Sequence, residues 1–434
     1  MHHPLTALAV GLGCALATAP ALSAQRVAPT AAALTLSRQA AIDSALSRNP
    51  QLEAARQQIA QAKARVTEAR AFPDLGLAYT VSDEAGLFRP GGGTSNEFDV
   101  GMTIPFPSRL VLRGRVAGAD VESSRFDYQG LRQQLASATA QAYDALLVAQ
   151  QHARDLREGQ QLAEEFLKRT EARFEGGTAA KLDVIKARVE LAQAANDLIA
   201  TERDISNARA SLNRLMGRPL GADLELTDSL AVPPAIPDLD SLEVAALRLR
   251  PELRSLAAQR AGANSAVSLA RQYWVPDIDL TLGRIGGGGA PTTWSTEVGI
   301  GFPLFFWQHH NGEVAEAEHH RQELNAVASD LTAQIAQEVR TAHADASTAL
   351  RQAVYLRDEL VPEAREAYRI ASVSYGLGGS STLEVLDARR TLLDAQSQYA
   401  DALGAVNDAV AQLELAVGAP LDSSARLPGD PDAQ

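Results

Sequence analysis

Two long stretches of the chain carry apolar side chains at steps of three and four residues, the period of an amphipathic helix. They cover about 110–174 and about 312–375. At about 1.5 Å per residue, each stretch predicts a rod roughly 95 Å long. The apolar seam of the first stretch has the spacing of a coiled coil. It is formed by Leu131, Leu135, Ala138, Ala142, Leu146, Ala149, Ala153 and Leu156.

Four short segments instead alternate strictly between apolar and polar residues, which predicts β-strands with one apolar face. They cover about 75–82, 97–104, 277–284 and 293–302. Strands of this length can cross a bilayer, with lipid on the apolar side and water on the other. The same alternation also fits an ordinary half-buried sheet.

The order of these elements occurs twice along the chain. Residues 173–188 read RFEGGTAAKLDVIKAR, and residues 374–389 read SYGLGGSSTLEVLDAR, an offset of 201 residues (375 − 174 = 201). Each segment is a glycine turn between a long helix and a return helix. An internal duplication is therefore predicted. It gives a first repeat at 37–217, a linker rich in Pro and Asp at 218–240, and a second repeat at 241–420.

The two ends of the chain read differently from the repeats. Residues 1–24 have a short polar start, an apolar run and a small-residue region, which predicts an export signal cleaved after Ala24. Cleavage before Cys14, with lipidation of that residue, is the alternative. The polar segment 421–434, with its prolines, is predicted to be a disordered tail.

Composition excludes several function classes. The net charge of −13 argues against a nucleic-acid partner, because the chain would not neutralise phosphates. The only cysteine lies in the predicted signal, so the mature chain would have neither a disulfide nor a cysteine-based site. We find no HExxH and no nucleophile-elbow motif, and the glycine runs do not open helices after buried strands. The sequence thus indicates neither an enzyme nor a cofactor.

Four strands are too few to enclose a pore, and an open strand edge is not tolerated in lipid. Several copies must then share one barrel. Three chains would give 3 × 4 = 12 strands with cyclic symmetry. The expected fold is mainly α with membrane β. In it, a long coiled-coil α-helical barrel continues a transmembrane β-barrel in the outer-membrane lipid, with four strands per protomer of a homotrimer.

The duplicated halves, the strand pair in each and the turn Y-x-x-G-x-x-x-x-x-[DE]-V-L-D-A at 375–388 resemble the TolC-like outer-membrane efflux proteins. The resemblance covers about 37–420. It implies a homotrimeric exit duct that spans the outer membrane and the periplasm of a Gram-negative cell. Its partners would be a periplasmic adaptor (membrane fusion) protein and an inner-membrane pump. The segments GFPLF at 301–305 and NGEV at 311–314 resemble the cation-efflux branch, which pairs with resistance-nodulation-division pumps.

The same resemblance implies roles for residues of the turns. Acids at Glu384 and Asp387 would ring the periplasmic aperture, where threefold symmetry would bring six carboxylates together. The alternative is that they only favour the first turn of a helix. Closed-state and tip contacts would involve Tyr375 and Gly378. The adaptor-docking tips would contain Gly176, Gly177, Gly378 and Gly379, which we expect to supply positive φ angles.

In the first repeat, Lys181 and Lys186 flank Asp183, so only the second repeat would supply an acidic ring. Histidines crowd the start of the second long helix. A Zn²⁺ or Cu²⁺ site and a plain solvated face are both compatible with them. We expect no metal site there. The weak candidates for metal ligands are His309, His310, His319 and His320.

The predicted function is a passive outer-membrane exit duct of a tripartite efflux system. Its cargo would be heavy-metal cations or small toxic compounds. Two alternatives stay open. One is an exit duct for polypeptides in type I secretion, and the other is a soluble periplasmic coiled-coil adaptor or scaffold.

Overall fold

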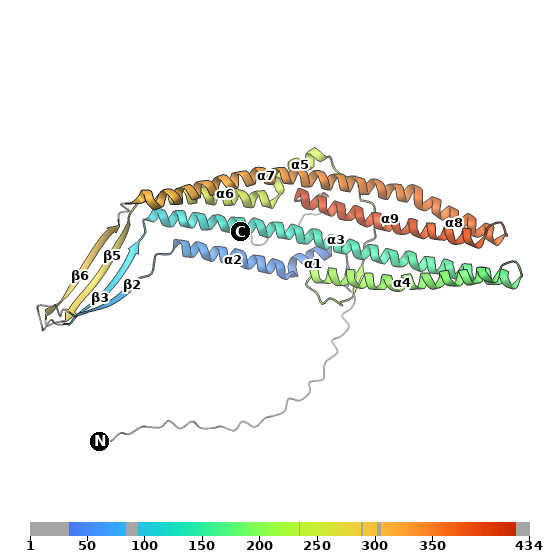
Figure 1. The fold of residues 1–434 in the computed structure, drawn as a ribbon, viewed down its shortest axis with the longest axis horizontal. Coiled ribbons are helices and arrows are strands. Elements are labelled where there is room, and N and C mark those ends of the chain that lie inside the picture. The colour runs from blue at the N-terminus through green and yellow to red at the C-terminus, as the bar shows by residue number, and fades with distance from the viewer. Residues whose placement is uncertain (1–33, 84–93, 234, 288–289, 302–304, 422–434) are drawn as a thin grey trace, which may run out of the picture.

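A long helical body carries a four-stranded sheet at one end (Figure 1). The structure is a computed structural model that describes residues 34–83, 94–233, 235–287, 290–301 and 305–421. The predicted signal and nearly all of the predicted tail lie outside these residues. Among the described helices, none combines the length and the apolar character needed to cross a bilayer.

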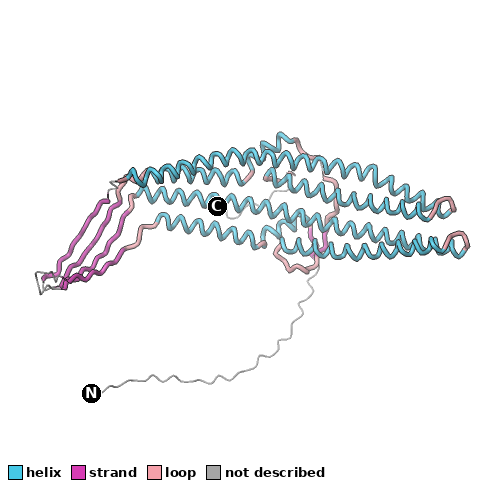
Figure 2. Tube along the Cα trace, viewed as in Figure 1, coloured by secondary structure: helices cyan, strands magenta, loops and turns pink. Residues whose placement is uncertain are grey.

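Two long helical hairpins form the body (Figure 2). In each, the second helix is shorter than the first, and two short helices pack along the rest of the first helix towards the sheet. The first hairpin consists of α3 (Pro107–Glu175) and α4 (Lys181–Leu215). In the second, α7 (Phe306–Tyr355) continues through a π turn into α8 (Val361–Gly376), and α9 (Thr382–Val417) returns. The shorter helices are α1 (Arg38–Arg48), α2 (Pro50–Arg70), α5 (Leu239–Leu249) and α6 (Pro251–Ala270).

Both pairs of short helices break at a proline in the first turn, where its missing N–H costs no hydrogen bond. The residue before each proline ties the break to the end of a return helix. Asn49 donates from its amide to the carbonyl of Leu215 at 2.8 Å, and Arg250 donates to the carbonyl of Leu415 at 3.2 Å. Two different side chains thus make equivalent contacts in the two halves.

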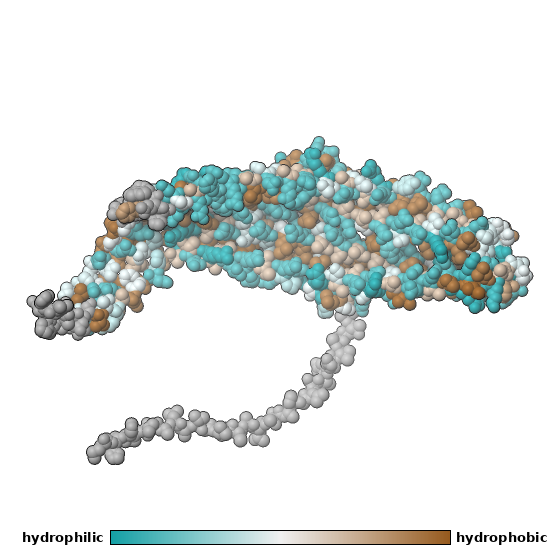
Figure 3. Space-filling view, viewed as in Figure 1, coloured by the Kyte–Doolittle hydropathy of each residue, from teal (hydrophilic) through white to brown (hydrophobic). Residues whose placement is uncertain are grey.

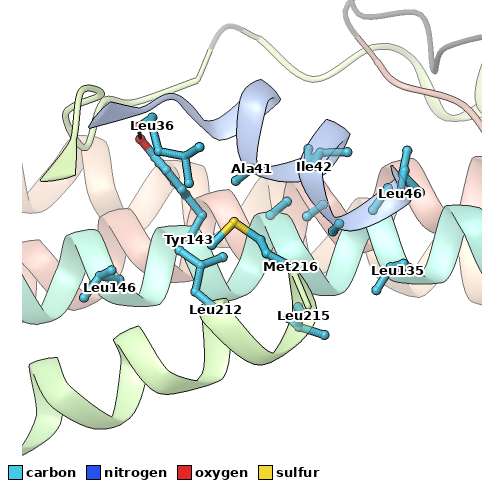
Figure 4. Close-up of a cluster of buried hydrophobic side chains, with 14 of the residues drawn as sticks. Leu36, Ala41, Ile42, Leu46, Leu135, Tyr143, Leu146, Leu212, Leu215 and Met216 are labelled. Atoms are coloured by element: carbon cyan, nitrogen blue, oxygen red, sulfur yellow. Dashed lines mark hydrogen bonds between the residues drawn. The ribbon is translucent and has the colours of Figure 1, made fainter. Parts of the chain in front are cut away.

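The largest apolar core lies where α1 meets α3 and α4 (Figure 4). Tyr143 is fully buried there, and its hydroxyl donates to the carbonyl of Leu36 at 2.8 Å. Leu36 belongs to β1 (Leu34–Leu36), which pairs in parallel with β4 (Leu224–Leu226). Strand β4 lies inside the segment 218–240, which was predicted to be the linker between the repeats. That segment therefore contributes to the core of the body.

The sheet has the order β2-β3-β5-β6, and all three pairings are antiparallel. Its strands are β2 (Gly76–Asp83), β3 (Thr94–Ile104), β5 (Asp277–Gly287) and β6 (Ala290–Gly301), all within three residues of the predicted bounds. Pairing between β3 and β5 joins the two hairpins, which lie far apart in the sequence.

The register places the predicted apolar positions that lie within the four strands on one face of the sheet. Leu77 pairs with Val100, which pairs with Leu282 on the other side. The large side chains of this face are exposed, as in Tyr79 at 65% and Val298 at 64%. Nothing in the described part of the chain covers the face. An ordinary half-buried sheet would have such a cover, whereas a lipid-facing sheet needs none.

One prediction about the helices is wrong. The second long helix was expected to run unbroken, but Leu356–Leu360 form a π turn between α7 and α8. Pro362 follows directly and has no N–H to donate back to residue 358, so the regular hydrogen-bond ladder is interrupted there. The corresponding position of the first repeat is Gln161 (362 − 201 = 161), and α3 is continuous.

A buried carboxylate lies beside the largest core. Asp144 accepts a hydrogen bond from the Arg38 guanidinium at 3.1 Å, and Asp408 and Asp228 lie close enough to repel its charge. Burial raises the pKa of Asp144 to about 6, although the charge of Arg38 works against this shift. The native state therefore holds a proton on this carboxyl that the unfolded chain releases above its ordinary pKa of 3.8.

Stability is accordingly predicted to fall as the pH rises from about 4 through about 6. The full change for Asp144 amounts to about 3 kcal/mol. The Asp144→Asn variant has no carboxyl group to titrate at this position. Its thermal unfolding midpoint should therefore fall less than that of the wild type between pH 4.5 and 7.5. Thermal unfolding of both proteins at the two pH values measures the difference. Identical falls would contradict the shifted pKa.

Candidate functional site

The two glycine turns lie together at the end of the helical body that is farthest from the sheet (Figure 1). Each has the same backbone hydrogen bonds. Thr178 N–H donates to the carbonyl of Arg173 at 2.8 Å, and Gly379 N–H donates to that of Ser374 at 2.9 Å. The donors and the acceptors are each 201 residues apart (379 − 178 and 374 − 173). The two similar sequence segments therefore form the same turn geometry.

Only one glycine in each turn has the expected positive φ. Gly177 has φ +72° and Gly378 has φ +83°, a region that side chains with a Cβ rarely adopt. The prediction is wrong for the other two. Gly176 has φ −77°, and Gly379 is absent from the positive-φ residues among those described. A Cβ on Gly379 would lie 2.8 Å from Ser374 Oγ, so a side chain there would force the Ser374 hydroxyl to move.

The predicted aperture acids lie exposed in the first turns of α9. The Glu384 carboxylate accepts from Ser381 N–H at 2.9 Å, while Ser381 Oγ accepts from Glu384 N–H at 3.3 Å, which completes a capping box. Glu384 thus has a structural role at the helix start. Neither it nor Asp387 forms an ion pair with any described residue. Both acidic side chains remain available to solvent at the tip.

Tyr375 is buried against helix α3 of its own chain. Its ring lies 5.2 Å from that of Phe166, and its hydroxyl donates to Thr170 Oγ1 at 3.3 Å. The Arg173 guanidinium stacks 4.4 Å from the ring and donates to the Tyr375 carbonyl. The predicted closed-state tyrosine therefore fastens the end of α8 to α3 within one protomer.

Sequence reasoning missed a buried ion pair two turns into α9. Arg389 is almost completely buried, donates to the Glu190 carboxylate of α4, and donates to the Gly159 carbonyl of α3 at 3.0 Å. Arg390 adds a second contact to Glu190 at 3.1 Å. Burial favours the neutral carboxyl, but hydrogen bonds from Arg390 and Arg389 outweigh it and lower the pKa of Glu190. The cluster joins α3, α4 and α9 behind the tip.

The equivalent arginine of the first repeat behaves differently. Arg188 aligns with Arg389, yet it is exposed and pairs with Glu171 at 2.7 Å. The two arginines share their sequence context, so local pattern carried no signal that one of them is buried. Only the packing of α9 against α3 and α4 distinguishes them.

The weak metal candidates were His309, His310, His319 and His320. His310 stacks on the Tyr273 ring at 4.4 Å and contacts Glu313 at 3.2 Å, while His320 contacts Glu323 at 3.1 Å. The side chain of His309 lies outside what the structure describes. Within the described residues, no group of three or more histidines, cysteines or acids is arranged to hold a metal ion.

The face of the sheet opposite the apolar one is strongly acidic. Thr103 donates to Asp279 at 2.6 Å across the β3–β5 pair. The register puts further carboxylates on this face. They belong to Glu97, Asp99 and Glu297. A surface of this kind attracts cations and suits a water-filled interior.

Known proteins resemble the chain over most of its length. Residues 41–218 and 242–419 match the family model of the outer membrane efflux protein. The cobalt-zinc-cadmium resistance protein CzcC of Cupriavidus metallidurans is 24% identical over 90% of this chain and 92% of its own length. The pyoverdine export outer membrane protein OpmQ of Pseudomonas putida is 26% identical over 80% of this chain and 78% of its own.

Solved structures share the fold. The outer-membrane channel OprN superposes with a TM-score of 0.76 at 21% identity, over 88% of this chain and 89% of that one. CusC superposes with a TM-score of 0.75 at 19% identity, over 88% and 92%. With both family matches falling on the paired hairpins described above, the chain belongs to the outer membrane efflux protein family.

Proposed function

We propose that this protein is the outer-membrane exit duct of a tripartite efflux system and conducts its cargo passively. The observation that carries the proposal is the two-faced sheet, with exposed apolar side chains on one side and carboxylates on the other. Its position at the end of a helix of 69 residues, or about 100 Å, fits a duct that continues well below the membrane.

The free edges of the sheet support an oligomer, and we propose a homotrimer. Within the described residues, strands β2 and β6 each pair with one strand, so their outer edges would leave backbone groups unpaired in lipid. Three copies joined edge to edge would close a barrel of 3 × 4 = 12 strands. The helical hairpins would then surround a common tube with the acidic face of the sheet at its outer end.

The cargo proposed first is a heavy-metal cation. The acidic face of the sheet and the exposed Glu384 and Asp387 at the tip would both favour cations. The cobalt-zinc-cadmium resistance protein among the relatives supports this choice. Small organic compounds are the second candidate, because a toluene efflux pump outer membrane protein is 30% identical over 54% of the chain.

The partners would be a periplasmic adaptor at the tips and an inner-membrane pump of the resistance-nodulation-division type. The tips carry exposed apolar side chains as well as polar ones (Figure 3). Leu377 is 85% exposed, Leu383 67% and Leu182 59%. Water-exposed leucines next to the turns with Gly177 and Gly378 would give an adaptor an apolar surface to bury.

The proposal is tested by fractionation and planar-bilayer recording of the purified mature protein. A duct should be found in the outer-membrane fraction, migrate as a heat-sensitive trimer and form conducting pores. A soluble monomer without conductance would refute it. Sensitivity of a deletion strain to Co, Zn and Cd, compared with toluene, separates the two cargo classes.

Removing the charges of the aperture acids should open the tip to ions. Glu384→Gln keeps the capping box, because glutamine can replace glutamate at that position, and Asp387→Asn removes the second charge. The double variant should show higher single-channel conductance and about tenfold weaker block by divalent cations, equivalent to about 1.4 kcal/mol. Glu202→Gln with Asp204→Asn removes the same charge from α4 as a control. Equal conductance and block in all three proteins would remove the aperture role.

The buried ion pair should hold the tip closed as well as folded. Glu190→Gln leaves Arg389 buried without a counter-charge, which costs about 3–5 kcal/mol. We expect a clearly lower thermal midpoint and more frequent openings in bilayer recordings. The exposed pair offers the matched control, because Glu171→Gln should change stability by at most about 1 kcal/mol. Similar midpoints for the two variants would contradict the importance of burial.

A further inference from the structure

A row of four residues crosses the apolar face of the sheet, one from each strand. Tyr79 pairs with Phe98, Phe98 with Arg284, and Arg284 with Trp294. The three aromatic side chains are exposed, Tyr79 at 65%, Phe98 at 45% and Trp294 at 66%. A single cation therefore lies within a row of aromatic rings, on a face whose other residues are mainly aliphatic, with polar exceptions such as Asn96 and Thr296.

Arg284 is the only basic residue in the four described strands. Its guanidinium lies 6.0 Å from the centre of the Trp294 ring, within the range of a cation–π contact. No carboxylate among the described side chains pairs with it, and the register puts Glu97, Asp99, Asp279 and Glu297 on the opposite face. An arginine is strongly destabilising at the middle of a bilayer, but near the interface this cost almost disappears.

A second set of exposed aromatic residues marks the other end of the strands. Each strand has one at the end that joins the helices, namely Phe72, Phe106, Trp274 and Phe305. The members of the two sets are 7, 8, 10 and 11 positions apart in the sequence (79 − 72, 106 − 98, 284 − 274 and 305 − 294). This spacing is close to the roughly 9–11 residues of a tilted transmembrane strand, so the two sets are placed to lie at the two boundaries of the apolar band.

The row with Arg284 is therefore at the interface away from the helices. In the proposed duct the helices lie in the periplasm, so this interface belongs to the outer leaflet. The outer leaflet of a Gram-negative outer membrane consists of lipopolysaccharide, whose lipid A headgroup carries phosphates. Guanidinium binds phosphate through two parallel hydrogen bonds.

We propose that Arg284 binds a lipid A phosphate of lipopolysaccharide, while the rings of Phe98 and Trp294 beside it contact the glucosamine and the upper acyl chains. The proposal rests on the membrane placement of the proposed function. A trimer presents three such sites on its outer surface. The phosphate of the lipid would supply a counter-charge in direct contact with Arg284.

The test uses the purified full-length mature trimer in a neutral detergent, and native mass spectrometry counts bound lipids. Diphosphoryl lipid A is titrated against the wild type, Arg284→Gln and Arg284→Lys, and phosphatidylglycerol is the comparison lipid. Arg203→Gln removes an exposed arginine of α4 that pairs only with its neighbour Asp204, as a matched control. Single-channel conductance of each preparation reports whether the barrel is intact.

We expect Arg284→Gln to bind lipid A about tenfold more weakly than the wild type and the control. Arg284→Lys should lie between them, because lysine keeps the charge but loses the planar fork. The wild type should prefer lipid A to phosphatidylglycerol. Equal lipid A affinity in a conducting Arg284→Gln variant overturns the site, as does equal affinity of the wild type for both lipids. Absence of conductance in the wild type would instead refute the proposed duct.

Discussion

The structure depends on one constraint, which is that a backbone N–H or C=O in lipid must have a partner within the protein. The four-stranded sheet satisfies this rule along three internal pairings and leaves it unsatisfied along the outer edges of β2 and β6. The requirement to close these edges makes the single chain incomplete as a membrane protein. In the proposed trimer, closing the sheet around an axis would also place the helical hairpins around that axis.

Much of this fold could be predicted from the sequence, because the apolar and polar positions repeat with the period of each element. Alternation located the strands, and steps of three and four located the long helices. The pairing of β3 with β5 and the parallel strands β1 and β4 could not be located in this way. They join segments that are distant in the sequence, and local periodicity does not depend on distant partners.

In the candidate site, too, local features could be predicted from the sequence and contacts between distant segments could not. The glycine turns and the acids Glu384 and Asp387 are visible as a motif, since a tight turn and a helix start need particular residues in consecutive positions. The burial of Arg389 could not be predicted from the sequence. Its partner Glu190 is 199 residues away, and its counterpart Arg188 has similar neighbours in the sequence. A duplicated sequence therefore predicts two similar turns, while the packing between the halves decides which charges become buried.

The interruption of the second long helix has a mechanical consequence. A π turn has one extra residue and poorer hydrogen-bond geometry, and none of its residues in Leu356–Leu360 is fully buried. Bending is therefore easier there than anywhere along the uninterrupted α3. Around a trimeric tube, three stiff hairpins would alternate with three hinged ones. In the proposed trimer, the three hairpins with the π turn would bend outward and widen the tip, while the three uninterrupted hairpins would keep their positions.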